Sequence, residues 1–180
     1  LKENEFELPV TFKYIDKYLN PGDRILDMAC GTGRYAQEFI QRGYHVGLND
    51  LSEKNMALTL TRLGNHPQIL QTEVSDALDA AIWNEGPWDA IVLLGPIYHL
   101  ISRNKRLDLL RKASASVRKG GYVFTAFMSR TAALLFGLKN NPAGILSKRG
   151  TRQLWNSGND EDFIEDTKWF VNAYFSFFLL

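Results

Sequence analysis

The order of short apolar runs and amphipathic stretches limits this chain to very few folds. Stretches with the helical spacing of apolar residues separate runs that have the length and character of buried strands. Strands that alternate with helices form parallel sheets with right-handed crossovers. The pattern therefore predicts an α/β fold, a doubly wound, mostly parallel sheet with helices on both faces. The five predicted strands are residues 24–29, 44–50, 68–74, 89–95 and 122–128.

For three of the predicted helices the sequence indicates an end or an apolar face. Residues 102–121 predict a helix that stops at a pair of glycines. Ser52 is the expected N-cap of the helix that follows the second strand. Residues 7–19 predict a leading helix, whose apolar face is expected to hold Val10, Tyr14, Ile15 and Tyr18.

Size and charge exclude several classes of function. A chain of 180 residues is most simply one domain. Its net charge of +1 gives no strong electrostatic footprint for nucleic acid or an anionic membrane. The single cysteine, Cys30, cannot form an internal disulfide. No leader or apolar run of membrane-spanning length stands out, so we expect a cytoplasmic protein.

A glycine-rich turn follows the first predicted strand. The stretch "GTGRYA", which begins at Gly31, fits the dinucleotide pattern G-x-G-x-x-G/A, and Asp50 lies at a suitable distance to hold a ribose. However, Asp27 stands four residues before Gly31, and no cation occurs in the loop before Arg34. A carboxylate suits a ligand with an ammonium group and repels a pyrophosphate. An NAD(P)-dependent oxidoreductase remains the alternative.

Five stretches follow one another along the chain: "ILDMACGTGRYAQEF", "VGLNDLSEKNM", "VSDAL", "WDAIVLLGPIYHL" and "LRKASASVRKGGYVFTAFMSR". In this order they resemble the motifs of the class I S-adenosylmethionine-dependent methyltransferases. The resemblance covers about residues 10–130 and implies a Rossmann-like methyltransferase fold with S-adenosylmethionine as cofactor. The element "GPIYHL" is similar to the small-molecule branch with the ubiquinone-biosynthesis-like domain, which implies a small-molecule methyl acceptor.

The resemblance implies a role for the acids and the turn residues at the strand ends. Asp27 would lie near the methionine moiety, and Asp50 would accept both ribose hydroxyls. Asp76 would meet the edge of the adenine. Each of these acids also has a plain capping interpretation. The implied cofactor-binding residues are Asp27, Ala29, Gly31, Gly33, Asp50, Leu51, Asp76, Ala77, Leu94 and Gly95.

One residue of the turn departs from the family pattern. Ala29 replaces the commonest first glycine, and its methyl group is tolerable if the local dihedral angles stay negative.

The catalytic candidates are Tyr98 and His99, which follow the fourth predicted strand. In the resembled fold the substrate and the methyl donor meet at this place, so His99 is a candidate to orient or deprotonate the nucleophile. A structural histidine is the competing interpretation. No metal site is expected, because a sulfonium donor brings its own activation.

The C-terminal part matches the family least. We expect residues 1–130 to form the S-adenosylmethionine-binding Rossmann-like domain, and residues 131–180 to add an insertion or lid and a C-terminal segment of the same domain. Family members continue into a further helix and antiparallel strands, so either these are missing or the aromatic tail, residues 169–180, supplies an unusual edge. A bare sheet edge and this tail suggest a homodimer. A non-catalytic binding or interaction protein is a second alternative.

Overall fold

The computed structural model describes residues 7–140, 142 and 174–175. The chain divides into two compact units. The first unit consists of Leu1–Leu94 and Asp108–Thr125, and the second of Gly95–Leu107 and Ala126–Leu180. Of residues 131–180, expected to form an insertion or lid and a C-terminal segment, the structure describes residues 131–140, 142 and 174–175. The aromatic tail, residues 169–180, therefore lies almost wholly outside the described residues.

The first unit is built on a five-stranded sheet in the order β3-β2-β1-β4-β5. All of its neighbouring strands pair in parallel. The strand order reverses between β1 and β4, which is the switch in a doubly wound sheet. The predicted fold class is therefore confirmed. The strands are β1 (Arg24–Met28), β2 (His45–Asp50), β3 (Ile69–Val74), β4 (Trp88–Leu93) and β5 (Val117–Thr125).

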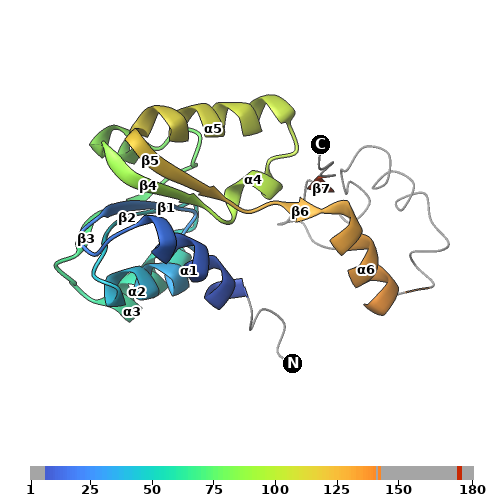
Figure 1. Ribbon diagram of the computed structural model, residues 1–180, viewed down its shortest axis with the longest axis horizontal. Helices are drawn as coiled ribbons and strands as arrows, with labels where there is room; N and C mark the ends of the chain where they lie inside the picture. Colours follow the sequence, from blue (N-terminus) through green and yellow to red (C-terminus); the bar gives the residue numbers. More distant parts are fainter. Residues whose placement is uncertain (1–6, 141, 143–173, 176–180) are drawn as a thin grey trace. The chain divides into compact units, whose positions relative to one another are not determined.

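Helices cover both faces of this sheet. Figure 1 shows α1, α2 and α3 together on one face, and α5 on the other. The helices are α1 (Glu7–Tyr18), α2 (Arg34–Gln41), α3 (Glu53–Leu63), the 3-10 helix η1 (Ala81–Glu85) and α5 (Arg103–Ser116).

The second unit contains a short helix, a longer helix and a two-stranded pairing. The strands β6 and β7 pair in parallel. Its elements, besides the start of α5, are α4 (Pro96–His99), β6 (Met128–Ser129), α6 (Arg130–Asn140) and β7 (Tyr174–Phe175).

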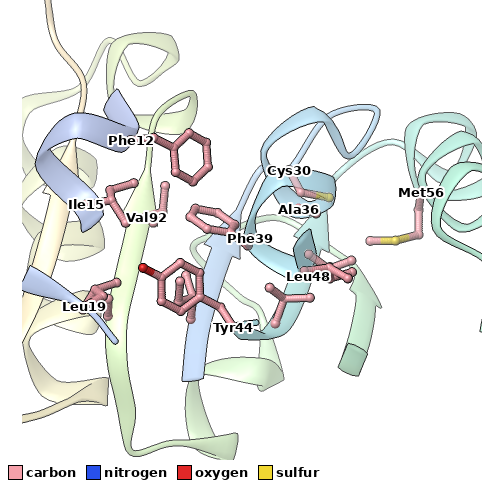
Figure 2. Close-up of a cluster of buried hydrophobic side chains, with 14 residues drawn as sticks. Phe12, Ile15, Leu19, Cys30, Ala36, Phe39, Tyr44, Leu48, Met56 and Val92 are labelled. Atoms are coloured by element: carbon pink, nitrogen blue, oxygen red, sulfur yellow. The ribbon is translucent and has the colours of Figure 1, made fainter. Parts of the chain in front are cut away.

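The hydrophobic core fills the space between the sheet and the three N-terminal helices. Figure 2 shows Phe39 between the side chains of α1 and the strands. In the middle of the sheet, β4 is buried at five of its six positions, whereas β3 at one edge alternates between half-buried and exposed side chains. Central parallel strands are covered on both faces, which explains the continuous apolar runs in the sequence.

The predicted apolar face of α1 is wrong at three of its four residues. Val10, Tyr14 and Tyr18 are exposed, and only Ile15 is buried. The buried stripe is Phe12, Ile15 and Leu19, with Phe12 packing against Phe39 at a centroid distance of 5.2 Å. Two apolar stripes share this helix, and periodicity alone cannot tell which of them faces the sheet.

The predicted boundary between α5 and β5 is also wrong. The helix ends at Ser116, and β5 begins at Val117, five residues before the expected start at Tyr122. The glycine pair lies inside the strand, where the register with β4 shifts between Trp88 and Ala90. A Cβ on Gly121 would stand 2.6 Å from the carbonyl oxygen of Asp89. Gly121 therefore permits a close strand approach, Gly120 has a φ of 77°, and the pair does not stop the helix.

Candidate functional site

The loop between β1 and α2 turns sharply. Ala29, Gly31 and Gly33 all have positive φ, at 62°, 58° and 75°. A Cβ on Gly33 would stand 2.7 Å from the methyl group of Thr59, a fully buried residue of α3. The Thr59 hydroxyl also donates a hydrogen bond of 2.9 Å to the carbonyl oxygen of Gly31. Glycine at position 33 is thus required both by the turn and by the closeness of α3.

Ala29 differs from the expectation of negative dihedral angles. Its φ of 62° places it in the left-handed region, where a side chain crowds the following carbonyl oxygen. The fold keeps this conformation because the residues on both sides of Ala29 are fixed: Met28 pairs with Asn49 in the sheet, and the Cys30 N–H donates to the carbonyl of Asn49. The backbone at Ala29 is therefore strained.

We expect Ala29→Gly to raise the free energy of unfolding by about 1 kcal/mol, because the strain of about 1–2 kcal/mol exceeds the added entropy of glycine in the unfolded chain. Urea unfolding measures the change. The matched control is Ala57→Gly in the exposed face of α3, which should lower stability by about 1 kcal/mol. If Ala29→Gly were less stable than the wild type, the prediction would be contradicted.

Asp27 is a buried acid near the carboxyl end of the central strand β1. It lies in β1, and only 3% of its surface is exposed. Among the described residues none donates a hydrogen bond to its Oδ2. Burial, and to a smaller degree the negative charge of Asp50, raises the pKa of Asp27 to about 7. A buried acceptor with these properties gains strongly from a cationic partner.

Asp50 connects two segments at the end of β2. Its Oδ2 accepts a hydrogen bond of 2.8 Å from the Gly31 N–H. Its Oδ1 accepts bonds from the Ser52 N–H at 2.9 Å and from Nδ2 of Asn55 at 3.1 Å. The predicted N-cap is confirmed, since the Ser52 hydroxyl accepts from the Asn55 N–H. The capping of α3 is thus done by Ser52, and Asp50 holds the glycine turn.

The loop after β3 carries Asp76 and Ala77. Asp76 is exposed and accepts the Leu78 N–H at its Oδ1, at 2.9 Å. The carbonyl oxygen of Ala77 accepts the indole N–H of Trp83, at 2.8 Å. The loop is therefore held in shape by the short helix η1 that follows it.

Glu73 provides the anchor for this loop, and the sequence reasoning missed it. Its carboxylate accepts the N–H groups of Ala81 and Ile82 at the start of η1, at 2.9 and 2.6 Å, and the hydroxyl of Ser75 at 2.8 Å. Burial opposes ionisation, but these hydrogen bonds outweigh it and lower the pKa of Glu73. The sequence signal for this role was a carboxylate one residue before the end of a strand, ahead of a short helix.

The strand register brings these residues together at the carboxyl ends of the parallel strands, which is the side of the sheet called the edge below. Met28 pairs with Asn49, and Asp50 pairs with Val74, so the carboxyl ends of β1, β2 and β3 lie side by side. Asn49 strengthens this edge, because its Nδ2 donates to the hydroxyl of Ser75 at 3.0 Å. Leu51 follows Asp50 and is 71% exposed at this edge.

The remaining predicted residues follow β4. Leu94 is half-buried and packs against the hydrophobic core between the sheet and the three N-terminal helices. Gly95 is the N-cap residue of α4 in the second unit. Within α4 the rings of Tyr98 and His99 lie 4.6 Å apart, and His99 is exposed.

The family model described as "Methyltransferase domain" matches residues 25–121. The chain belongs to this family. The match begins in β1 and ends in β5, so it spans the sheet and the acids at its edge. The resemblance to the class I S-adenosylmethionine-dependent methyltransferases is confirmed, and with it the cofactor of the family.

Curated relatives of this methyltransferase domain include two bacterial proteins named ubiquinone biosynthesis O-methyltransferase. The one from Caulobacter vibrioides is 25% identical over 114 residues, which are 63% of this chain and 44% of the relative. The one from Xanthomonas axonopodis is 26% identical over 128 residues, 69% of this chain and 52% of the relative. The chain thus spans about half the length of the curated relatives it matches.

Solved structures share the fold. An S-adenosylmethionine-dependent methyltransferase from Methanosarcina mazei has a TM-score of 0.69 at 17% identity, and the match covers 91% of this chain and 77% of that one. The N-methyltransferase NodS from Bradyrhizobium japonicum has a TM-score of 0.62 at 17% identity, with 74% and 75% covered.

The residues of this methyltransferase domain fit the cofactor of its family. The methionine end of S-adenosylmethionine carries an ammonium group, and Oδ2 of Asp27 is a buried acceptor to which no described residue donates. In the described part of the chain, no group of three or more His, Cys, Asp or Glu is placed to hold a metal ion. None of the described helices is both long and apolar enough to cross a membrane.

Proposed function

We propose that this chain binds S-adenosylmethionine at the edge formed by β1, β2 and β3, and transfers the methyl group to a small-molecule acceptor. The observation that carries the proposal is the buried carboxylate of Asp27, with an oxygen that accepts no bond from a described residue, in the strand that leads into the glycine turn. This arrangement favours a cationic amino-acid group over a pyrophosphate. The predicted cofactor domain, residues 1–130, contains all these residues.

The methionine end would lie against β1 and its turn. Asp27 would receive the ammonium group, and the backbone of Ala29, Gly31 and Gly33 would line this side. Since these three residues have positive φ, the turn exposes backbone where the side chains are small or absent.

The adenosine end would lie along β2 and β3. Asp50 would accept from the ribose, and the exposed side chain of Leu51 would pack on the adenine. Asp76 and Ala77 would meet the edge of the base, on the loop that η1 holds in place. Leu94 and Gly95 would border the sulfonium.

The cofactor supplies an activated methyl group when it is bound. The protein's task is then to align the acceptor in line with the methyl group and to exclude water. Tyr98 and His99 are the proposed acceptor-side residues, with His99 orienting the nucleophile or taking its proton. Their roles stay predictions.

The acceptor is proposed as a small molecule with an oxygen or nitrogen nucleophile. The relatives named above are O-methyltransferases of ubiquinone biosynthesis, and similar folds include a sugar N-methyltransferase from Streptoalloteichus with a TM-score of 0.57. The cytoplasmic location and the homodimer stay predictions.

Titration calorimetry with S-adenosylmethionine, S-adenosylhomocysteine and NAD tests the proposal. We expect both sulfur ligands to bind. At pH 8, above the Asp27 pKa of about 7, NAD should bind more weakly because the ionised carboxylate repels its pyrophosphate. Equal or tighter binding of NAD would overturn the assignment. With a labelled methyl donor, a panel of phenols and amines then tests transfer. Binding without transfer to any acceptor would favour the non-catalytic alternative.

A further inference from the structure

The carboxylate of Asp50 has most of its hydrogen-bonding capacity already in use. An ionised carboxylate offers about four lone-pair positions, two on each oxygen. Oδ1 accepts from the Ser52 N–H and from Nδ2 of Asn55, so both of its positions are occupied. Oδ2 accepts from the Gly31 N–H and has one position left. A ribose presents two hydroxyl donors, and Asp50 in this arrangement can accept only one of them.

Asn55 places a second acceptor beside this carboxylate. It is the third residue of α3, and its backbone N–H is fixed by the hydroxyl of Ser52 at 3.2 Å. Its side-chain Nδ2 donates to Oδ1 of Asp50 at 3.1 Å. The carboxylate thereby determines the orientation of the amide, because the reversed amide would bring two oxygens together. The amide oxygen of Asn55 is left to accept, and no donor among the described residues reaches it in a hydrogen bond.

The capping of α3 does not explain this side chain. The cap needs only the backbone N–H of residue 55, which any residue except proline supplies. Asparagine is also a poorer helix former than alanine. The side chain is half-buried, and its one hydrogen bond to a described residue runs to the carboxylate that is proposed to hold the ribose.

We propose that Asn55 and Asp50 divide the recognition of the ribose diol, with one hydroxyl donating to Oδ2 of Asp50 and the other to the amide oxygen of Asn55. This inference rests on the proposed function, since it concerns the same ligand. The class of ligand is a nucleoside with both hydroxyls free. A phosphate on either hydroxyl would be repelled by Asp50.

The test compares S-adenosylhomocysteine with its 2′-deoxy and 3′-deoxy analogues by calorimetry on the wild type and on Asn55→Ala. For the wild type we expect both analogues to bind more weakly than the parent. Asn55→Ala should weaken the parent about fivefold, as expected for one neutral hydrogen bond. One of the two analogues lacks the hydroxyl that donates to Asn55. Asn55→Ala and the wild type should bind this analogue equally tightly, because neither can make that hydrogen bond.

The controls separate this role from a structural one. Lys54→Ala changes the exposed neighbour in the first turn of α3 and should leave all three affinities unchanged. A general distortion of the loop by Asn55→Ala would weaken the three ligands equally and would overturn the inference. So would a wild type that loses affinity for only one analogue. A wild type that binds no S-adenosylhomocysteine would instead refute the proposed function.

Discussion

Replacing Asp27 with asparagine is expected to stabilise the free protein and to weaken its binding of S-adenosylmethionine. The pKa of the buried carboxyl is raised from 3.8 to about 7, with burial as the main cause and the charge of Asp50 as the second. At pH 8 the folded chain must hold the ionised form at a cost on the order of a few kcal/mol, since each pKa unit corresponds to about 1.4 kcal/mol. The amide removes this cost.

The sign of the pH dependence follows from the same shift. The folded-state pKa of Asp27 lies above its unfolded value, so its contribution to stability is fully present below pH 3.8 and is lost as the pH rises through about 7. Urea unfolding between pH 5 and pH 8, at about unit steps, should show a stability gain for Asp27→Asn that grows with pH. Asp76→Asn, at an exposed carboxylate, is the control and should show little change. No gain at pH 8 would contradict the prediction.

The affinity for S-adenosylmethionine should fall in Asp27→Asn, whereas the stability rises. The ammonium group pairs with the ionised carboxylate, so the wild-type affinity for S-adenosylmethionine is expected to rise as the pH increases through about 7. The Asp27→Asn variant should bind more weakly and without this rise. Calorimetry in buffers of different ionisation enthalpy would also detect the proton released on binding at lower pH. An affinity that is independent of pH in the wild type would argue against the pairing.

Replacing Asp50 with alanine should weaken the cofactor by roughly ten- to a hundredfold, the value of about 1.5–3 kcal/mol for hydrogen bonds to a charged group. Stability should also fall by about 1–3 kcal/mol, because the donors on Gly31, Ser52 and Asn55 lose their shared acceptor. Calorimetry and urea unfolding measure the two effects.

The control for this variant separates binding from folding. Ser52→Ala removes the N-cap of α3 and should lower stability by about 1 kcal/mol with little change in cofactor affinity. If the folded Asp50→Ala variant kept the wild-type dissociation constant, Asp50 would serve only to hold the turn.

The fold could be predicted from the sequence because the apolar pattern within each strand indicates the strand without knowledge of its neighbours. The continuous apolar run of β4 and the alternation of β3 correspond to a central and an edge position. The acids Asp27 and Asp50 could be found in the same way, since each stands at the end of a strand. Their roles toward a ligand stay predictions.

The rest depended on contacts between residues far apart in the chain. The engagement of Asp50 with Gly31 joins residues 19 positions apart, and the bond from Thr59 to the same loop joins residues 28 apart. No local sequence pattern predicts that the oxygens of Asp50 already accept hydrogen bonds from the protein, or that Ala29 has a positive φ. The choice between the two apolar stripes of α1 likewise depended on the sheet it packs against.

The backbone of Gly31 is hydrogen-bonded on both sides of its Cα, since its N–H donates to Asp50 and its carbonyl oxygen accepts from Thr59. The turn therefore has its shape before any ligand arrives. A loop ordered only on binding would lose about 1–2 kcal/mol of backbone entropy for each residue that became fixed. In this chain that loss occurs during folding, so it is not subtracted from the binding free energy, which still includes the ligand's loss of translational and rotational freedom.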